Sequence, residues 1–75
     1  MLQLIKLWIV TYTLENGKKN KCRFYTYENK NTKDKTYIIK NDLMEFEREV
    51  SVIEGNSYFL DLLKYDKNAV VNKVV

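Results

Sequence analysis

The chain has 75 residues, with no histidine, no proline, one cysteine and two glycines. A single cysteine excludes an intrachain disulfide, and without histidine the chain lacks a principal zinc ligand and the commonest general base. The acidic residues form no catalytic constellation, so we predict a protein that is not an enzyme and carries no metal or cofactor. Cys22 alternates with apolar residues, where a free cysteine usually behaves as a small buried hydrophobe.

Long hydrophobic runs and glycine-rich loops are also missing. The apolar opening MLQLIKLWIV is interrupted by Gln3 and Lys6, and it is shorter than the roughly 20 residues that span a membrane. No small-residue cleavage site follows it. Gly17 and Gly55 each have a role as a turn or a helix end, which leaves no glycine for a phosphate-binding loop. We therefore expect one domain over residues 1–75, in the cytoplasm and without a membrane segment.

Charge is divided along the chain. Residues 18–40 contain eight basic and two acidic side chains, whereas residues 41–54 contain one basic and five acidic side chains. This division indicates two surfaces of opposite sign for different partners, an internal match of charge between neighbouring elements, or two solvated faces.

Asn16-Gly17 is a strong hairpin signal between two segments of alternating polarity. A two-residue loop would mix the apolar and basic faces. A three-residue loop with Gly17 in the left-handed conformation pairs Val10 with Cys22 and Trp8 with Phe24. We predict the second register because a slip of one residue sends the whole apolar set of a strand to the wrong face.

The rest of the chain predicts a small α+β fold: the hairpin, one or two further strands, and one helix near 42–53. Residues 36–40 read as a third strand and residues 58–65 as a buried strand, with a second helix as the alternative for residues 58–65. Helical spacing, a capping-box pattern at Asp42 and Glu45, and Gly55 favour the helix. The same segment also alternates like a strand, which leaves an all-β meander of five strands or a small barrel as the alternative. The tail, 68–75, is expected to be flexible or to pair with this sheet or with another copy.

A basic and aromatic stripe is predicted on one side of the second hairpin strand. Its members are Lys19, Lys21, Arg23, Tyr25 and Tyr27. Cationic side chains neutralise phosphates and tyrosine rings stack on bases, so the stripe suits nucleic acid. Tyrosine and arginine also anchor protein interfaces, so it equally suits a protein partner.

A second candidate surface is an acidic row formed by Glu45, Glu47 and Glu49. On a strand these carboxylates would repeat every 6.6–6.8 Å or so, which is close to the spacing of successive phosphates. Such a row can imitate a nucleic-acid backbone. On a helix, Glu45 and Glu49 would instead share a solvated face.

These patterns predict a small binding protein that docks on a host nucleic-acid-handling protein and inhibits or modulates it, as an anti-CRISPR inhibitor does with a defence nuclease. The abundance of lysine, asparagine and tyrosine is typical of AT-rich genomes and suggests a phage or another mobile element. One alternative is a module that binds nucleic acid directly. Another is a structural subunit that assembles through Val70 to Val75, and a homodimer is expected.

Overall fold

The computed structural model describes residues 1–43 and 46–75 as five strands and one helix. The strands are β1 (Leu2–Thr13), β2 (Lys19–Asn29), β3 (Lys35–Asn41), β4 (Phe46–Val50) and β5 (Val70–Lys73), and the helix is α1 (Val52–Tyr65). All neighbouring strands are antiparallel, in the order β4-β3-β2-β1-β5. The predicted α+β class is confirmed, and the sheet is open rather than closed into a barrel.

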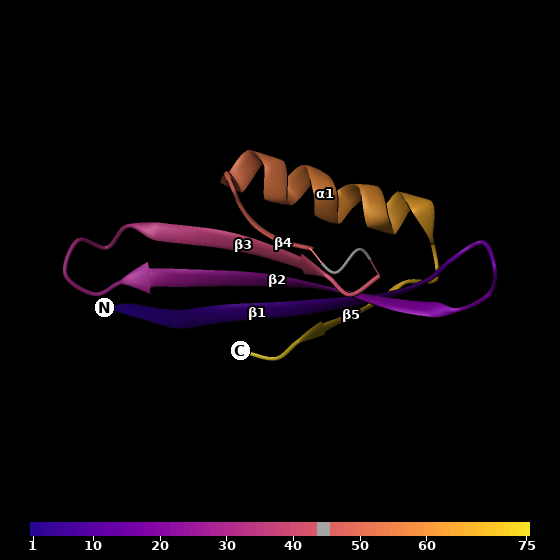
Figure 1. The fold of residues 1–75 in the computed structure, drawn as a ribbon, viewed down its shortest axis with the longest axis horizontal. Coiled ribbons are helices and arrows are strands. Elements are labelled where there is room, and N and C mark those ends of the chain that lie inside the picture. Colours follow the sequence, from indigo (N-terminus) through magenta and orange to yellow (C-terminus); the bar gives the residue numbers. More distant parts are fainter. Residues whose placement is uncertain (44–45) are drawn as a thin grey trace.

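The chain order explains why the molecule has two layers. Strands β1 to β4 follow one another as a meander, so β4 lies at one edge of the sheet, while β5 lies at the other edge beside β1. The helix joins these two edges and must therefore cross a face of the sheet. Figure 1 shows α1 above the strands, with no described element on the opposite side. We call that opposite side the open face.

The hairpin has the register that the apolar pattern predicts. Val10 pairs with Cys22 and Trp8 with Phe24. The Leu14 N–H donates to the Lys18 carbonyl at 2.8 Å, and Gly17 has a φ of +85°, a conformation that costs other residues about 1–2 kcal/mol. The hydrophobic pattern thus selected the correct one of two turn geometries.

The helix is misplaced in the sequence prediction, because residues 46–50 form strand β4 and α1 begins only at Val52. A helix near 42–53 would place Leu43 and Ile53 on its apolar face, yet these side chains are 55% and 75% exposed. The real capping box lies at the start of α1. There the Ser51 Oγ accepts from the Glu54 N–H, and the Glu54 carboxylate accepts from the Ser51 N–H. Asp42 lies in a turn, and Glu45 lies outside the described residues.

Residues 58–65 are the second correction, since they lie in α1 and not in a buried strand. Tyr58, Phe59, Leu62 and Leu63 recur at helical spacing and pack against the core of the sheet. Gly55, expected to end a helix, lies in the first turn of this one, where an added Cβ would meet Val50 at 3.5 Å. A strand here would have left the helix side of the sheet without a cover.

The apolar core lies between α1 and the sheet. Its buried members among the described residues are few, as expected for a chain of this length: Val10, Tyr12, Cys22, Ile39, Val50 and Leu62. Trp8 and Phe24 are only half-buried, and the ring of Phe59 contacts both of them edge to face at 5.8 and 5.5 Å.

A polar network occupies the end of the core next to the hairpin turn. The Asn20 side-chain amide donates to the Tyr12 hydroxyl at 2.7 Å and to the Asn41 side-chain carbonyl at 3.0 Å. The Asn41 amide donates in turn to the hydroxyls of Tyr12 and Tyr58. This network connects β1, β2 and β3 to α1, and nothing in the sequence pattern predicted it.

Candidate functional site

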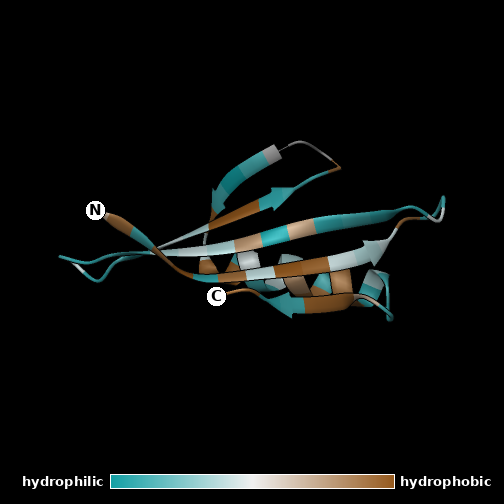
Figure 2. Ribbon diagram, turned by 90° about the horizontal axis from the view of Figure 1, so that it is seen from below, coloured by the Kyte–Doolittle hydropathy of each residue, from teal (hydrophilic) through white to brown (hydrophobic). Residues whose placement is uncertain are grey.

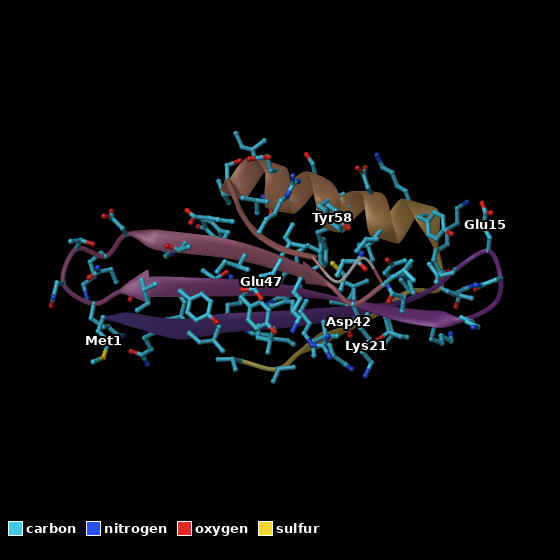
Figure 3. The ribbon with its side chains drawn as sticks, in the orientation of Figure 1. Met1, Glu15, Lys21, Asp42, Glu47 and Tyr58 are labelled. Atoms are coloured by element: carbon cyan, nitrogen blue, oxygen red, sulfur yellow. The ribbon has the colours of Figure 1, made fainter. Side chains whose placement is uncertain are left out.

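The predicted basic and aromatic stripe lies along β2, the middle strand of the sheet, and its side chains belong to the open face. The alternation on β2 sends Asn20, Cys22 and Phe24 toward α1, so the residues between them point the other way. In Figure 3, Tyr58 reaches from α1 to the sheet, whereas Lys21 extends from the far side. The structure thus brings the five predicted stripe residues together on one surface.

The central part of the stripe, around Tyr25, has apolar neighbours that the sequence prediction missed. In the register of the sheet, Tyr25 lies between Leu7 on β1 and Ile38 on β3, Tyr27 lies opposite Leu4, and Arg23 lies opposite Ile9. All these side chains are half-buried. Figure 2 views the sheet from this side and shows hydrophobic stretches on β1 and β3 to either side of β2.

A sequence signal for this apolar surface exists in two continuous apolar runs. Residues 7–10 and residues 37–39 are apolar at every position rather than at every second one. Continuous runs of this kind are typical of strands that are covered on both faces, whereas strands with one solvent-exposed face alternate apolar and polar residues. Here the described chain covers only the face toward α1.

The two tyrosines of the stripe form one flat element. Their rings stack with centroids 6.1 Å apart and an angle of 15° between planes. Tyrosine side chains offer a large contact area with few rotatable bonds, so a pre-stacked pair loses little conformational entropy when a partner covers it.

Acidic neighbours partly offset the basic charge of the stripe. Arg23 forms a salt bridge with Asp42, which follows β3, and this hydrogen bond raises the pKa of the guanidinium. Lys40 on β3 lies opposite Arg23 of β2 and, on its other side, opposite Glu47 of β4. Lys19 and Lys21 are exposed near the hairpin turn, and the Lys21 carbonyl accepts a hydrogen bond from the Asp42 N–H at 3.1 Å, so Lys21 also lies beside Asp42.

The acidic row lies partly on the same face. Glu47 and Glu49 are exposed on β4, opposite Lys40 and Ile38, at one edge of the open face. The two carboxylates therefore border the apolar centre instead of forming a separate surface. The predicted third member, Glu45, lies outside the described residues.

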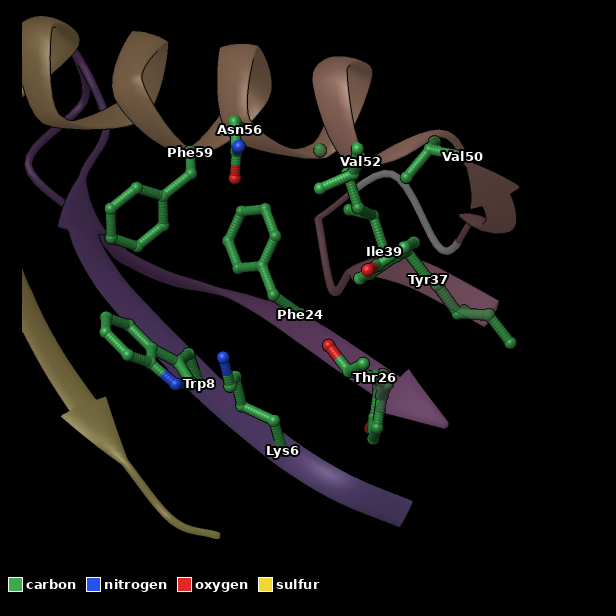
Figure 4. Close-up of a pocket in the computed structure, with 13 residues that line it drawn as sticks. Lys6, Trp8, Phe24, Thr26, Tyr37, Ile39, Val50, Val52, Asn56 and Phe59 are labelled. Atoms are coloured by element: carbon green, nitrogen blue, oxygen red, sulfur yellow. The ribbon is translucent and has the colours of Figure 1, made fainter. Parts of the chain in front are cut away.

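A groove of about 350 Å³ opens between the sheet and the N-terminal half of α1. Figure 4 shows Trp8, Phe24 and Phe59 along its wall, with the Lys6 side chain at its rim. The buried Trp8 Nε1–H has no hydrogen-bond partner among the described residues. That nitrogen has almost no exposed surface, so a ligand in the groove would not reach it, and the open face remains the better candidate site.

Cys22 is fully buried, and its burial, with a smaller effect of the Asp42 charge, raises the pKa of the thiol to about 12. Because the thiolate is the reactive form, we expect a disulfide reagent at mildly alkaline pH to leave Cys22 unmodified in the folded protein. The same reagent should modify it promptly in denaturant. Rapid modification under native conditions would show that the core opens easily or that Cys22 is not buried.

Within residues 1–43 and 46–75, no group of three or more potential ligand side chains is placed to hold a metal ion. No described helix combines the length and apolar character that crossing a membrane requires. The fold and site define a small α+β chain with a helix on one face of its sheet and an apolar, charge-bordered surface on the other. The chain matches no protein-family model, and comparisons with curated proteins and with solved structures find no match either.

Proposed function

We propose that this chain is a non-enzymatic protein-binding module that docks through the open face of its sheet. The observation that carries the proposal is an apolar and aromatic centre on β1, β2 and β3 that no described element covers. Apolar area removed from water contributes roughly 25 cal/mol per Å². A partner protein that covers this centre therefore gains a driving force that a solvated sheet face would not provide.

The pattern of charges favours a protein over a direct nucleic-acid ligand. Binding to phosphates draws on cations that can replace counterions, and on this face Arg23 already pairs with Asp42 while Glu47 and Glu49 line the edge. The centre consists of Leu7, Ile38 and the tyrosine pair. An apolar centre with a mixed-charge rim is the usual anatomy of a protein interface.

We further propose the target class that the sequence suggested, a nucleic-acid-handling host protein that the chain inhibits or modulates from within the cytoplasm. Such a protein offers a basic groove for Glu47 and Glu49 and acidic patches for Lys19 and Lys21. A phage or mobile-element origin is part of the same proposal. The support is the division of charge along the chain and across the open face.

The test compares matched variants in pull-downs from lysates of candidate hosts. Ile38→Ala and Tyr25→Ala should each weaken capture of a specific partner by about 30-fold or more if they are interface hot spots. Ile53→Ala, on the exposed side of α1, is the matched control and should capture the partner like the original chain. If Ile38→Ala and Ile53→Ala behave alike, the open face is not the docking surface.

Direct nucleic-acid binding is tested separately, with purified protein and labelled DNA or RNA. We expect weak binding, with little change in the salt slope when Lys19 and Lys21 are both replaced by glutamine, which places no new carboxylate beside Asp42. Arg23 is left intact because its loss would remove the salt-bridge partner of Asp42. Tight binding whose salt slope falls by about 1.8 in the double variant would instead support a duplex DNA binder.

A further inference from the structure

The outer edge of β5 is a second exposed surface, separate from the open face. β5 ends the sheet on the side of β1, and no described strand lies beyond it (Figures 1 and 2). Val70 and Val74 are 54% and 56% exposed, and Val71 is 36% exposed. Native proteins commonly protect an edge strand by keeping it very short or by placing proline, a bulge or charged residues on it. β5 is four residues long and carries one charge, Lys73, while its other exposed side chains are valines and an asparagine.

The backbone directions along this edge follow from the hydrogen bonds of β1. Leu7 donates to the Val75 carbonyl and accepts from the Val74 N–H, so its backbone groups point toward β5. Successive residues of a strand direct these groups to opposite neighbours. Ile9 and Thr11, two and four residues further on, therefore bond Asn72 and Val70, their partners in the register. The N–H and C=O groups of Val71 and Lys73 are left pointing outward.

We propose that a second copy of this chain occupies the edge, with the two β5 strands pairing antiparallel about a two-fold axis at Asn72. In this register each Val71 exchanges backbone hydrogen bonds with Lys73 of the other copy. The two Asn72 side chains lie directly opposite each other and can hydrogen-bond as donor and acceptor. Each Val70 lies opposite Val74 of the other copy, so the two valine side chains pack together on the open-face side of the paired β5 strands.

Charge also favours this register. Each Lys73 lies opposite a Val71 of the other copy, and the two Lys73 side chains are only diagonal neighbours. Like charges directly opposite each other would be destabilising, and this register avoids that arrangement. The aliphatic part of each lysine can cover the neighbouring valine while its ammonium group stays in water. The interface is isologous and closes after two copies, so it gives a dimer and not a filament.

The dimer would join two sheets of five strands into one continuous sheet of ten. A two-fold axis perpendicular to the sheet keeps both helices on one side and both open faces on the other. The pairing is independent of the proposed docking role, since it uses a different surface. If both hold, the dimer presents two docking surfaces in the same direction, and binding to a two-site partner gains avidity.

The first test removes the outward N–H of Val71. Val71→Pro deletes a donor that points away from β1, and proline is tolerated on an edge strand with its nitrogen facing solvent. We expect the original chain to sediment as a dimer over a concentration series and Val71→Pro to sediment as a folded monomer. An original chain that stays monomeric throughout, or a Val71→Pro variant that remains dimeric, would overturn the proposal.

The second test is disulfide trapping, which needs no destabilising change. Residues paired without backbone hydrogen bonds across antiparallel strands have Cα atoms about 4.5 Å apart, within the range for a disulfide. Asn72→Cys should therefore crosslink two copies under mild oxidation. Val71→Cys is the matched control, because its two copies lie about 7–8 Å apart on the diagonal. Equal crosslinking of both variants, or no crosslinking of Asn72→Cys, would exclude this register. The original chain, whose single cysteine Cys22 is buried, gives the background level of crosslinking.

Discussion

Ile39→Ala is expected to lower the free energy of unfolding by about 2–5 kcal/mol. Ile39 is 2% exposed and lies on β3 beside Phe24, beneath α1. The substitution removes buried methyl groups and leaves a cavity that the surrounding sheet cannot close. Because a single core in a chain of this length rarely supplies more than about 3–5 kcal/mol, the variant should be largely unfolded. Urea titration followed by circular dichroism measures the change.

The adjacent residue provides the control for Ile39. Ile38 has the same side chain but lies half-exposed on the open face, so Ile38→Ala should cost much less stability while weakening partner capture. The pair separates folding from docking at neighbouring positions of one strand. Similar losses of stability in both variants would mean that the two faces of β3 are equally buried, contrary to this structure.

Asn41→Ala is expected to have the second-largest effect, a loss of about 2–4 kcal/mol. Asn41 is 3% exposed, accepts from the Asn20 amide and donates to the hydroxyls of Tyr12 and Tyr58. Its removal leaves buried polar groups without a partner, at about 1–3 kcal/mol for each. Thermal unfolding should show this as a fall in Tm of about 4–8 °C for every kcal/mol lost.

Asn31→Ala is the matched control, since Asn31 is exposed in the loop before β3. Its backbone N–H donates a hydrogen bond to the Asn29 side chain, and the substitution keeps this donor. This substitution should change stability by no more than about 0.5 kcal/mol. If Asn41→Ala is no more harmful than Asn31→Ala, the polar network does not contribute to stability, and water replaces its hydrogen bonds without cost.

The sequence was most informative where local chemistry and the apolar pattern agree. Asn16-Gly17 set the position of the hairpin turn, and the alternation of Trp8 and Val10 against Cys22 and Phe24 chose its register. A register error would have moved whole apolar sets into water, so the competing arrangement was strongly disfavoured. The five residues of the stripe follow from the same alternation, because strand geometry sends every second side chain to one side.

The helix could not be located in this way because two segments carry similar local signals. Residues 42–53 have good helix formers and a capping-box pattern, yet residues 46–50 become strand β4. In β4 these residues pair with the backbone N–H and C=O groups along the free edge of β3, which a helix could not do. α1 forms instead from Ser51 onward, where the apolar face of Tyr58, Phe59 and Leu62 covers the sheet. Packing against partners distant in sequence overrode local propensity.

The sequence by itself determined the hairpin, its register and the residue types of the candidate face, because these depend on turn chemistry and on a period of two. Only the tertiary structure decided that the stripe lies at the centre of the sheet with Leu7 and Ile38 beside it. It also decided that Asp42 pairs with Arg23, that Asn41 connects the sheet to Tyr58 on α1, and that β5 is an edge. These features arise from contacts between segments far apart in the chain, and strand order and helix position create those contacts.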